Sequence, residues 1–157
     1  MLLAVATAAG AQSFEIAHQG LLRRYVAHLP PQQAAGRPLQ LLIALHGTSM
    51  RAEDMFAYTD LPALADREGI VLVAPASVGP LFNDGFGAAG TEAAALDDVG
   101  FIEAVADDAR TRFGARADAV YVVGLSNGGS MVQRLAIESR YPFAGFAAVA
   151  SAPRVAT

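Results

Sequence analysis

The stretch that decides the fold is VYVVGLSNGGSMVQRLA, Val120–Ala136. Its first residues are β-branched and predict a buried strand over Ala119–Val123, and its last residues are apolar at helical spacing. Between them lies G-L-S-N-G, Gly124–Gly128, which matches the pattern G-x-S-x-G. A sharp turn from strand to helix holds the central residue in a strained conformation, with its side chain above the end of the sheet. The stretch therefore predicts that Ser126 is a nucleophile.

A glycine-rich turn between a strand and a helix is also compatible with a purely structural role or with phosphate binding. Neither G-x-x-x-x-G-K-[ST] nor G-x-G-x-x-G occurs at this turn, which argues against phosphate. The turn directs the backbone N–H of Asn127 toward a developing oxyanion, at the positive end of the helix. We therefore interpret Ser126 as the nucleophile and Asn127 as an oxyanion donor.

The rest of the chain alternates between apolar runs and amphipathic segments. This alternation predicts one α/β domain, in which a mostly parallel sheet is flanked by helices. Gln19-Gly20 is expected to be the hairpin turn between the first two strands, and the glycines at 69 and 114 are expected to be C-caps of two helices. The expected strands are Ser13–His18, Leu21–Leu29, Leu39–Leu45, Ile70–Ala74, Ala119–Val123 and Ala144–Ala150. The expected helices are Thr59–Glu68, Asp97–Phe113 and a helix from the turn to about Arg140.

The loop after the strand Leu39–Leu45 reads His46-Gly47-Thr48-Ser49. In a sheet of this kind that loop supplies the second oxyanion donor. The backbone N–H of Thr48 is the first choice and that of Ser49 the second. His46 itself is either a general base or a buried histidine that organises the loop, and we favour the second interpretation.

A serine hydroxyl needs a base that removes its proton. In folds with this turn the chain order is Ser, then Asp or Glu, then His. After Ser126 the sequence has no His and no Asp, and its acid there is Glu138. The histidines at 18, 28 and 46 all precede the serine, and the apolar segment Gly145–Ala150 is expected to form an unpaired sheet edge. We therefore expect that the C-terminal strands of the domain, with the catalytic Asp and His, are missing from this chain.

Composition excludes several classes of protein. The 157 residues are 54% hydrophobic and 17% charged, which fits one packed domain and not a disordered chain. The net charge of −4 and the lack of a basic run argue against nucleic acid as a partner. No uncharged apolar run approaches the ~18 residues that a membrane span needs. Cysteine is absent, so we expect no disulfide and no thiolate metal site.

Other polar residues are weaker candidates for a site. Asn83-Asp84-Gly85 could line a substrate cleft, although a turn formed for backbone reasons is the favoured interpretation. Asp97, Asp98, Asp107 and Asp108 contain no metal-site pattern, and we expect them on solvated helix faces. No metal or organic cofactor is expected.

The N-terminus reads MLLAVATAAGA, Met1–Ala11, and Ala9-Gly10-Ala11 has the A-x-A form of a signal-peptidase site. We expect residues 1–11 to be the remnant of a signal peptide and residues 12–157 to be a partial α/β domain. A frayed alanine-rich terminus is the alternative. A signal peptide predicts a secreted or periplasmic protein.

With these residues in hand, the sequence resembles the polyhydroxybutyrate depolymerase and feruloyl esterase family of secreted α/β-hydrolases. The resemblance rests, in order, on Arg23–Pro30, Leu41–Gly47, Asp97–Asp108, Val120–Ala136 and Phe143–Ser151. It implies an α/β-hydrolase fold and hydrolysis of carboxylic esters: polyhydroxyalkanoates, feruloyl or acetyl esters of plant polysaccharide, or simple short-chain esters.

The resemblance also assigns roles to single residues. It implies that Ser126 is the nucleophile and that Asn127 and the loop at Thr48 form the oxyanion hole. The family's Asp and His come after the last strand of this chain. Many members have Cys where this chain has Thr48, and Trp where it has Phe82.

We therefore interpret the chain as a truncated serine esterase that works by acyl transfer on an ester substrate and is inactive by itself. Two alternatives stay open. One is a serine peptidase of the same fold. The other is a non-catalytic binding or assembly module, whose edge strand pairs with a second chain.

Overall fold

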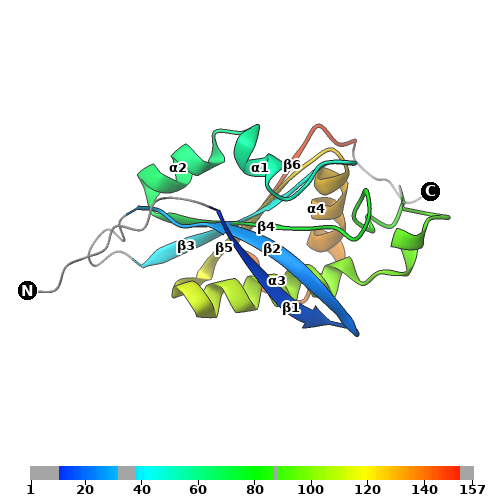
Figure 1. Ribbon diagram of the computed structural model, residues 1–157, viewed down its shortest axis with the longest axis horizontal. Helices are drawn as coiled ribbons and strands as arrows, with labels where there is room; N and C mark the ends of the chain where they lie inside the picture. The colour runs from blue at the N-terminus through cyan, green and yellow to red at the C-terminus, as the bar shows by residue number, and fades with distance from the viewer. Residues whose placement is uncertain (1–10, 32–37, 87, 153–157) are drawn as a thin grey trace, which may run out of the picture.

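The computed structural model describes residues 11–31, 38–86 and 88–152 (Figure 1). The expected leader, apart from Ala11, lies outside the described residues. The strands are β1 Gln12–His18, β2 Leu21–His28, β3 Leu39–Leu45, β4 Ile70–Pro75, β5 Ala115–Leu125 and β6 Gly145–Val149. The helices are α1 Asp54–Ala57, α2 Leu61–Glu68, α3 Asp98–Phe113 and α4 Asn127–Glu138, with a 3₁₀ turn, η1, at Glu92–Ala95.

The strands form one sheet in the order β1-β2-β4-β3-β5-β6. The pairs β3/β4, β3/β5 and β5/β6 are parallel, whereas β1/β2 and β2/β4 are antiparallel. The predicted α/β class is confirmed, and the sheet is mixed because the N-terminal hairpin pairs with β4. No helix among the described residues is long and apolar enough to cross a bilayer.

Local sequence patterns predicted most of the strands and helices correctly. The strand Leu39–Leu45 has the predicted bounds. Gln19 and Gly20, with φ of 46° and 79°, form the predicted hairpin turn. Gly69 and Gly114 both adopt the left-handed conformation at helix C-termini, as predicted.

Other bounds were wrong. β5 begins at Ala115, earlier than predicted, because its first part is polar and exposed and therefore outside the apolar run. The short elements α1 and η1 were not predicted, since a single turn carries no periodic pattern.

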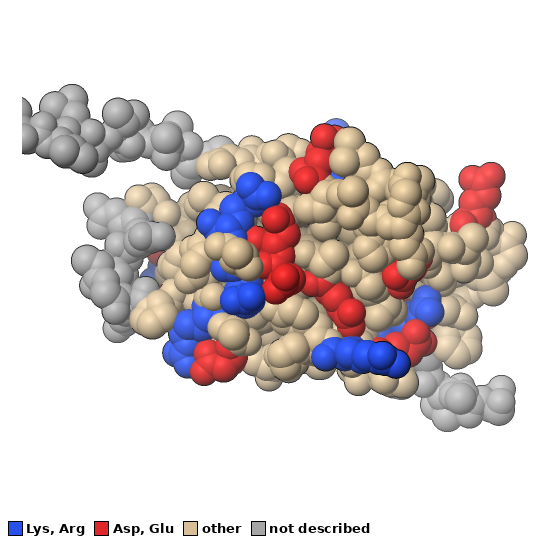
Figure 2. All heavy atoms as spheres, turned by 90° about the horizontal axis from the view of Figure 1, so that it is seen from below, with Lys and Arg blue, Asp and Glu red and all other residues tan. Residues whose placement is uncertain are grey.

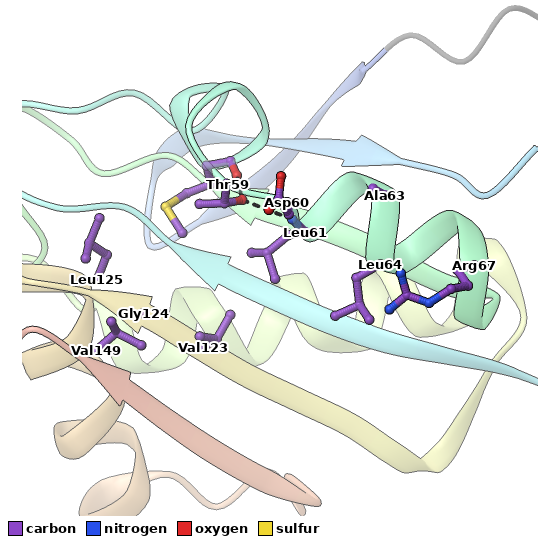
Figure 3. A pocket seen from close by; sticks show the side chains of 11 residues that line it. Thr59, Asp60, Leu61, Ala63, Leu64, Arg67, Val123, Gly124, Leu125 and Val149 are labelled. Carbon is purple, nitrogen blue, oxygen red and sulfur yellow. Dashed lines mark hydrogen bonds between the residues drawn. The ribbon is translucent and has the colours of Figure 1, made fainter.

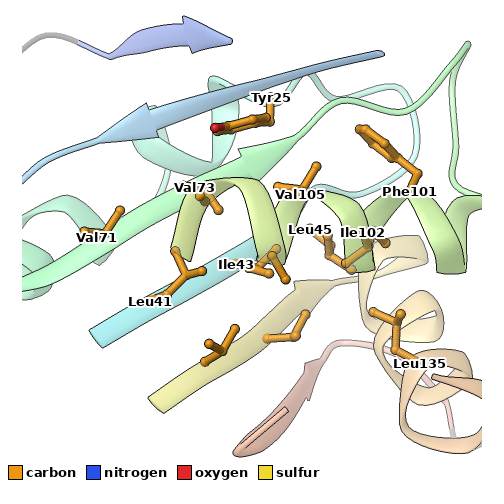
Figure 4. Packing of buried hydrophobic residues seen from close by; sticks show 14 of the residues in the cluster. Tyr25, Leu41, Ile43, Leu45, Val71, Val73, Phe101, Ile102, Val105 and Leu135 are labelled. Carbon is orange, nitrogen blue, oxygen red and sulfur yellow. The ribbon is translucent and has the colours of Figure 1, made fainter. Parts of the chain in front are cut away.

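The helices cover the sheet in two layers. Most of the core lies between the sheet and the helices α3 and α4 (Figure 4). There α3 buries Phe101, Ile102 and Val105 against the strands, and each such side chain contributes about 1.5–3 kcal/mol. A smaller cluster packs α1 and α2 against the other face, where Met55 and Ala65 meet Leu72. β6 is exposed along most of its length.

One acidic residue contradicts the prediction of solvated helix faces. Asp98 is fully buried at the N-terminus of α3, and its Oδ1 accepts a 2.7 Å hydrogen bond from Arg23 on β2. Its Oδ2 accepts a 2.6 Å bond from the backbone N–H of Asn83. The Arg23 guanidinium also lies 3.7 Å from the centre of the Phe101 ring. Burial of the carboxylate is compensated because a cation, an amide and a helix N-terminus surround it.

The remaining acidic residues on α3 behave more as expected. Asp107 is exposed and its carboxylate lies 3.0 Å from Arg110. Asp108 pairs with Arg112 at 3.0 Å. On the face seen from below the sheet, basic and acidic side chains lie beside one another (Figure 2).

We predict that Asp98→Ala lowers the free energy of unfolding by about 3–5 kcal/mol, because it leaves the buried Arg23 charge without its partner. Urea unfolding followed by circular dichroism measures the loss. The matched control is Asp118→Ala, which breaks an exposed pair with Arg116 and should change stability little. Equal losses in the two variants would contradict the prediction.

Candidate active site

The turn at Ser126 joins the end of β5 directly to the start of α4. Ser126 has φ of 55° and ψ of −116°, a conformation that L-residues rarely adopt. Two backbone hydrogen bonds hold it there. The Ser126 N–H donates to the carbonyl of Val149 on β6 at 2.9 Å, and its carbonyl accepts from Ser130 on α4 at 2.9 Å. The strain, of about 1–3 kcal/mol, is therefore maintained by both neighbouring elements.

Two glycines of the motif are required by close backbone approaches. A Cβ on Gly124 would collide with the carbonyl of Gly128 on the first turn of α4. A Cβ on Gly128 would in turn collide with the carbonyls of Leu45 and His46 at the end of β3. Small residues at these positions let β3, β5 and α4 meet at one point beside Ser126.

The loop after β3 adjoins this turn. A Cβ on Gly47 would lie 3.4 Å from the Cβ of Ser126, so the two segments are in near contact. The Ser49 N–H already donates to the carbonyl of Pro80 at 2.6 Å. The amides of Thr48 and Asn127 have no hydrogen-bond partner in the part of the chain that the structure describes. The geometry thus favours Thr48 over Ser49 as the second donor.

His46 is buried beneath this loop, with an exposed fraction of 1%. Its Nδ1 donates to the carbonyl of Gly47 at 2.9 Å, and its Nε2 accepts from the Ser77 N–H at 3.2 Å. These partners fix the neutral tautomer with the proton on Nδ1. Burial lowers the pKa of the imidazole from its ordinary value of 6.5. His46 therefore organises the loop, as expected, because both ring nitrogens are engaged away from Ser126.

A small polar cavity of ≈ 270 Å³ opens at Ser126. Asp84 belongs to its wall, and Asp84 Oδ1 also accepts from the N–H groups of Phe86 and Ala88 at 3.0 and 3.2 Å. Asp84 therefore forms a turn, as the favoured interpretation expected, and also lines this cavity; its place in a substrate cleft stays a prediction. The lining residues are Thr48, Leu81, Asp84, Ser126, Asn127, Ser130, Ala150, Ser151 and Ala152.

The side chain of Asn127 has a role that the sequence did not indicate. Its Oδ1 accepts from the backbone N–H of Phe82 at 2.8 Å, and its Nδ2 donates to the carbonyl of the same residue at 3.2 Å. Arg134, about two turns further along the same face of α4, donates to the carbonyl of Asn83 at 2.8 Å. The loop that carries Asp84 is thus attached to α4 by three hydrogen bonds. No pattern in the sequence reveals such a pairing of side chain and distant peptide.

None of the described histidines bonds to Ser126. His18 pairs with Asp97 at 3.0 Å, His28 pairs with Asp66 at 2.7 Å, and His46 bonds as described above. Within the described ranges there is also no group of three His, Asp or Glu side chains that could hold a metal ion. The described residues thus place Ser126 at a cavity beside two backbone N–H groups that have no partner among them, but they bring no histidine to it.

Comparison with known proteins connects this geometry to a family. The model of the family described as esterase PHB depolymerase matches residues 23–156. NocK of Nocardia uniformis subsp. tsuyamanensis, which is provisionally named an esterase, is 35% identical over 139 residues, or 87% of this chain and 40% of NocK. Feruloyl esterase B of Neurospora crassa is 32% identical over 116 residues, or 71% of this chain and 38% of that protein.

A solved structure supports the fold independently. FphF, a fluorophosphonate-binding serine hydrolase of Staphylococcus aureus, superposes with a TM-score of 0.70 at 19% identity. The match covers 90% of this chain and 57% of FphF. This chain spans about two fifths of the length of the curated relatives it matches.

We predict that Gly124→Ala and Gly128→Ala each lower the free energy of unfolding by more than about 3 kcal/mol, because the added methyl group meets backbone that cannot move aside. Soluble yield and urea midpoints measure the effect. The matched control is Gly145→Ala on β6, where the methyl would lie 3.2 Å from the movable ring of Tyr121. A small, equal loss at all three glycines would refute the close-approach argument.

We also predict that His46 titrates below pH 6.5, because burial opposes its protonation. The Cε1–H resonance of His46, followed by NMR against pH, reports the midpoint. The unfolded chain binds this proton near pH 6.5, so the stability from neutral His46 is complete above pH 6.5 and is lost as the pH falls toward the lower folded pKa. A midpoint at or above 6.5 would show that the imidazole is not held in the neutral form.

Proposed function

The chain belongs to the PHB depolymerase family of esterases, and from that premise we propose that it carries the nucleophile and oxyanion hole of a serine carboxylic-ester hydrolase. The observation that supports this most strongly is the strained turn at Ser126, which opens into a cavity shared with Thr48 and Asn127. The family membership supports ester hydrolysis as the class of chemistry.

In the proposed reaction, Ser126 Oγ loses its proton to a base and attacks the carbonyl carbon of the ester. The carbonyl oxygen becomes an oxyanion, which accepts hydrogen bonds from the backbone N–H groups of Asn127 and Thr48. The tetrahedral intermediate then expels the alcohol, which takes the proton back from the base and leaves an acyl-serine. Water attacks the acyl group by the same route and releases the acid.

The base in this proposal is a histidine oriented by an aspartate, in the chain order that this fold requires. Neither residue type follows Ser126 in the printed sequence. The reaction uses no metal and no organic cofactor, since proton transfer and oxyanion stabilisation suffice for acyl transfer.

For the substrate we propose a polyester such as polyhydroxyalkanoate, or a feruloyl or acetyl ester on plant polysaccharide. The family model and Feruloyl esterase B support these classes. Thr48 lines the cavity, and Phe82 bonds to Asn127 beside it. This chain departs from many family members at these two positions, so both bear on the choice among these esters. We further propose a secreted or periplasmic location, supported by the leader-like composition of Met1–Ala11.

We predict that the 157-residue chain hydrolyses p-nitrophenyl acetate no faster than its Ser126→Ala variant, because its serine has no base. A chimera, in which residues 12–157 replace the matched part of NocK, should hydrolyse the ester. Ser126→Ala should then lower kcat/KM of the chimera by at least about 10³-fold. Ser130→Ala is the matched control, since this serine lines the same cavity and is not the proposed nucleophile.

Three outcomes would overturn parts of this proposal. Rapid hydrolysis by the 157-residue chain that is lost in Ser126→Ala would show that a base is present after all. A folded chimera whose hydrolysis does not depend on Ser126 would remove the nucleophile assignment. A folded chimera with no hydrolysis would favour the non-catalytic binding module.

A further inference from the structure

The two proposed oxyanion donors lie on segments that are far apart in the sequence. The N–H of Asn127 lies at the start of α4, whereas the N–H of Thr48 lies in the loop after β3. An oxyanion hole stabilises charge only when its donors are oriented before the charge develops. Contacts between the two segments must therefore fix the direction of both N–H groups.

The backbone contacts at the serine turn fix one donor better than the other. At this turn β5 and β6 lie side by side, with Leu125 beside Val149 (Figure 3). The Val149 carbonyl accepts from the Ser126 N–H at 2.9 Å, which holds the start of α4. The close approach of Gly128 fixes the carbonyls at the end of β3, but Thr48 lies beyond that point in the loop. The direction of the Thr48 N–H therefore needs a further contact.

The Thr48 N–H belongs to the same peptide group as the carbonyl of Gly47. His46 Nδ1 donates to this carbonyl at 2.9 Å. In a planar trans peptide the carbonyl and the N–H point in opposite directions. The bond from His46 therefore directs the Thr48 N–H away from the imidazole, so the position of the imidazole sets the direction of this donor.

The ring of Phe82 packs on this imidazole. The ring centroids of His46 and Phe82 are 4.7 Å apart, and the two planes are inclined at 42°. The exposed fraction is 1% for His46 and 0% for Phe82. Aromatic rings at this separation attract each other in addition to the effect of the area that they bury. The imidazole is thus held by the Phe82 ring and by the Ser77 N–H, which donates to Nε2 at 3.2 Å.

The backbone of Phe82 is held by the residue that supplies the other donor. Asn127 Oδ1 accepts from the Phe82 N–H at 2.8 Å, and Asn127 Nδ2 donates to the Phe82 carbonyl at 3.2 Å. Two buried bonds to one residue restrain its orientation as well as its distance from α4. Phe82 is therefore in contact with both halves of the proposed oxyanion hole, by its backbone on one side and by its ring on the other.

We infer that Phe82 is a positioning residue of the oxyanion hole, which connects the two N–H donors through the side chain of Asn127 and the imidazole of His46. The inference rests on the proposed function, which identifies the N–H groups of Asn127 and Thr48 as the donors. Phe82 is not among the residues that line the cavity at Ser126. Its effect is on the alignment of the donors, so it stabilises the transition state and does not bind the substrate.

The loop that carries Phe82 is joined to the loop of Thr48 on both sides of the threonine. Before it, His46 accepts from the N–H of Ser77. After it, the N–H of Ser49 donates to the carbonyl of Pro80 at 2.6 Å. These bonds make the two loops one unit, to which the Phe82 ring adds a side-chain contact. The alternative, in which the ring only fills the core, predicts a loss of stability without a change in the donors.

The first test observes the donors by NMR in the 157-residue chain and requires no catalysis. Phe82→Leu keeps an apolar side chain but removes the ring. We expect the amide resonances of Thr48 and Asn127 to move. We also expect the pKa of His46 to rise from its lowered value toward 6.5, since less of the imidazole is then buried. The matched control is Phe113→Leu at the C-terminus of α3, which packs on the same core and should leave all three signals unchanged.

The second test measures hydrolysis of p-nitrophenyl acetate by the chimera with NocK. Phe82→Leu and Asn127→Ala should each lower kcat by about 10- to 100-fold with little change in KM, because a donor misplaced by ~1 Å stabilises the oxyanion poorly. Asn127→Ala keeps the backbone N–H and removes the two bonds to Phe82. The double variant should lose no more than the less active single variant, since both changes break one connection. Phe113→Leu should keep the kcat of the chimera.

Circular dichroism shows whether each variant is folded, and Asn127→Ala tests the same connection if Phe82→Leu does not fold. Unchanged resonances of Thr48 and Asn127 in Phe82→Leu would overturn the inference. So would an active chimera that keeps its kcat in both single variants, or losses that add in the double variant. A chimera without Ser126-dependent hydrolysis contradicts the proposed function instead, and the NMR signals then decide whether Phe82 positions the two N–H groups.

Discussion

The structure depends on a contact between backbone atoms at the centre of the sheet. Gly128 on α4 lies against the carbonyls of Leu45 and His46, and Gly124 on β5 lies against Gly128. Because no side chain separates these segments, the ends of β3 and β5 and the start of α4 are fixed relative to one another. The position of Ser126 follows from this contact, since the serine joins two segments that are already fixed. The position of the loop after β3 also follows from this contact, because Gly47 in that loop is in near contact with Ser126.

Side-chain hydrogen bonds then attach the long loop between β4 and α3 to this centre. Asn127 bonds both backbone groups of Phe82, and Asp98 accepts from the next N–H in the chain. Asp98 is in turn balanced by Arg23, which connects the loop to β2. A surface loop usually has few such constraints. Here the constraints hold Asp84 in the wall of the cavity, so residues from four distant parts of the chain define one small site.

The sequence predicted those structural features that depend on a local pattern of residues. The strand Leu39–Leu45, the hairpin at Gln19-Gly20 and the turn at Ser126 follow from alternation, turn propensity and a short motif, and the structure contains all three. The burial of Asp98 did not follow, because an acidic residue at a helix start has the same pattern whether it is solvated or paired. The bond between Asn127 and Phe82 joins residues 45 positions apart and has no local signature. The predicted start of β5 was too late because Arg116 and Asp118, which form an exposed ion pair, interrupt the apolar pattern of the strand.

The site also shows which parts of the proposed acyl-transfer chemistry the described elements can position. The proposed nucleophile lies between β5 and α4, and the proposed amide donors lie at the start of α4 and in the loop after β3. The contacts that hold them come from these elements and from Val149 on β6. A base, in contrast, would have to approach Ser126 from outside the described residues, since the described histidines are all bonded elsewhere. Oxyanion stabilisation requires donors that are already oriented before charge develops, and a backbone turn meets this requirement without a base. In the proposed reaction, the nucleophile and the oxyanion donors thus belong to the strained turn and its neighbouring loop at the centre of the sheet, whereas proton transfer needs a group from outside the described residues.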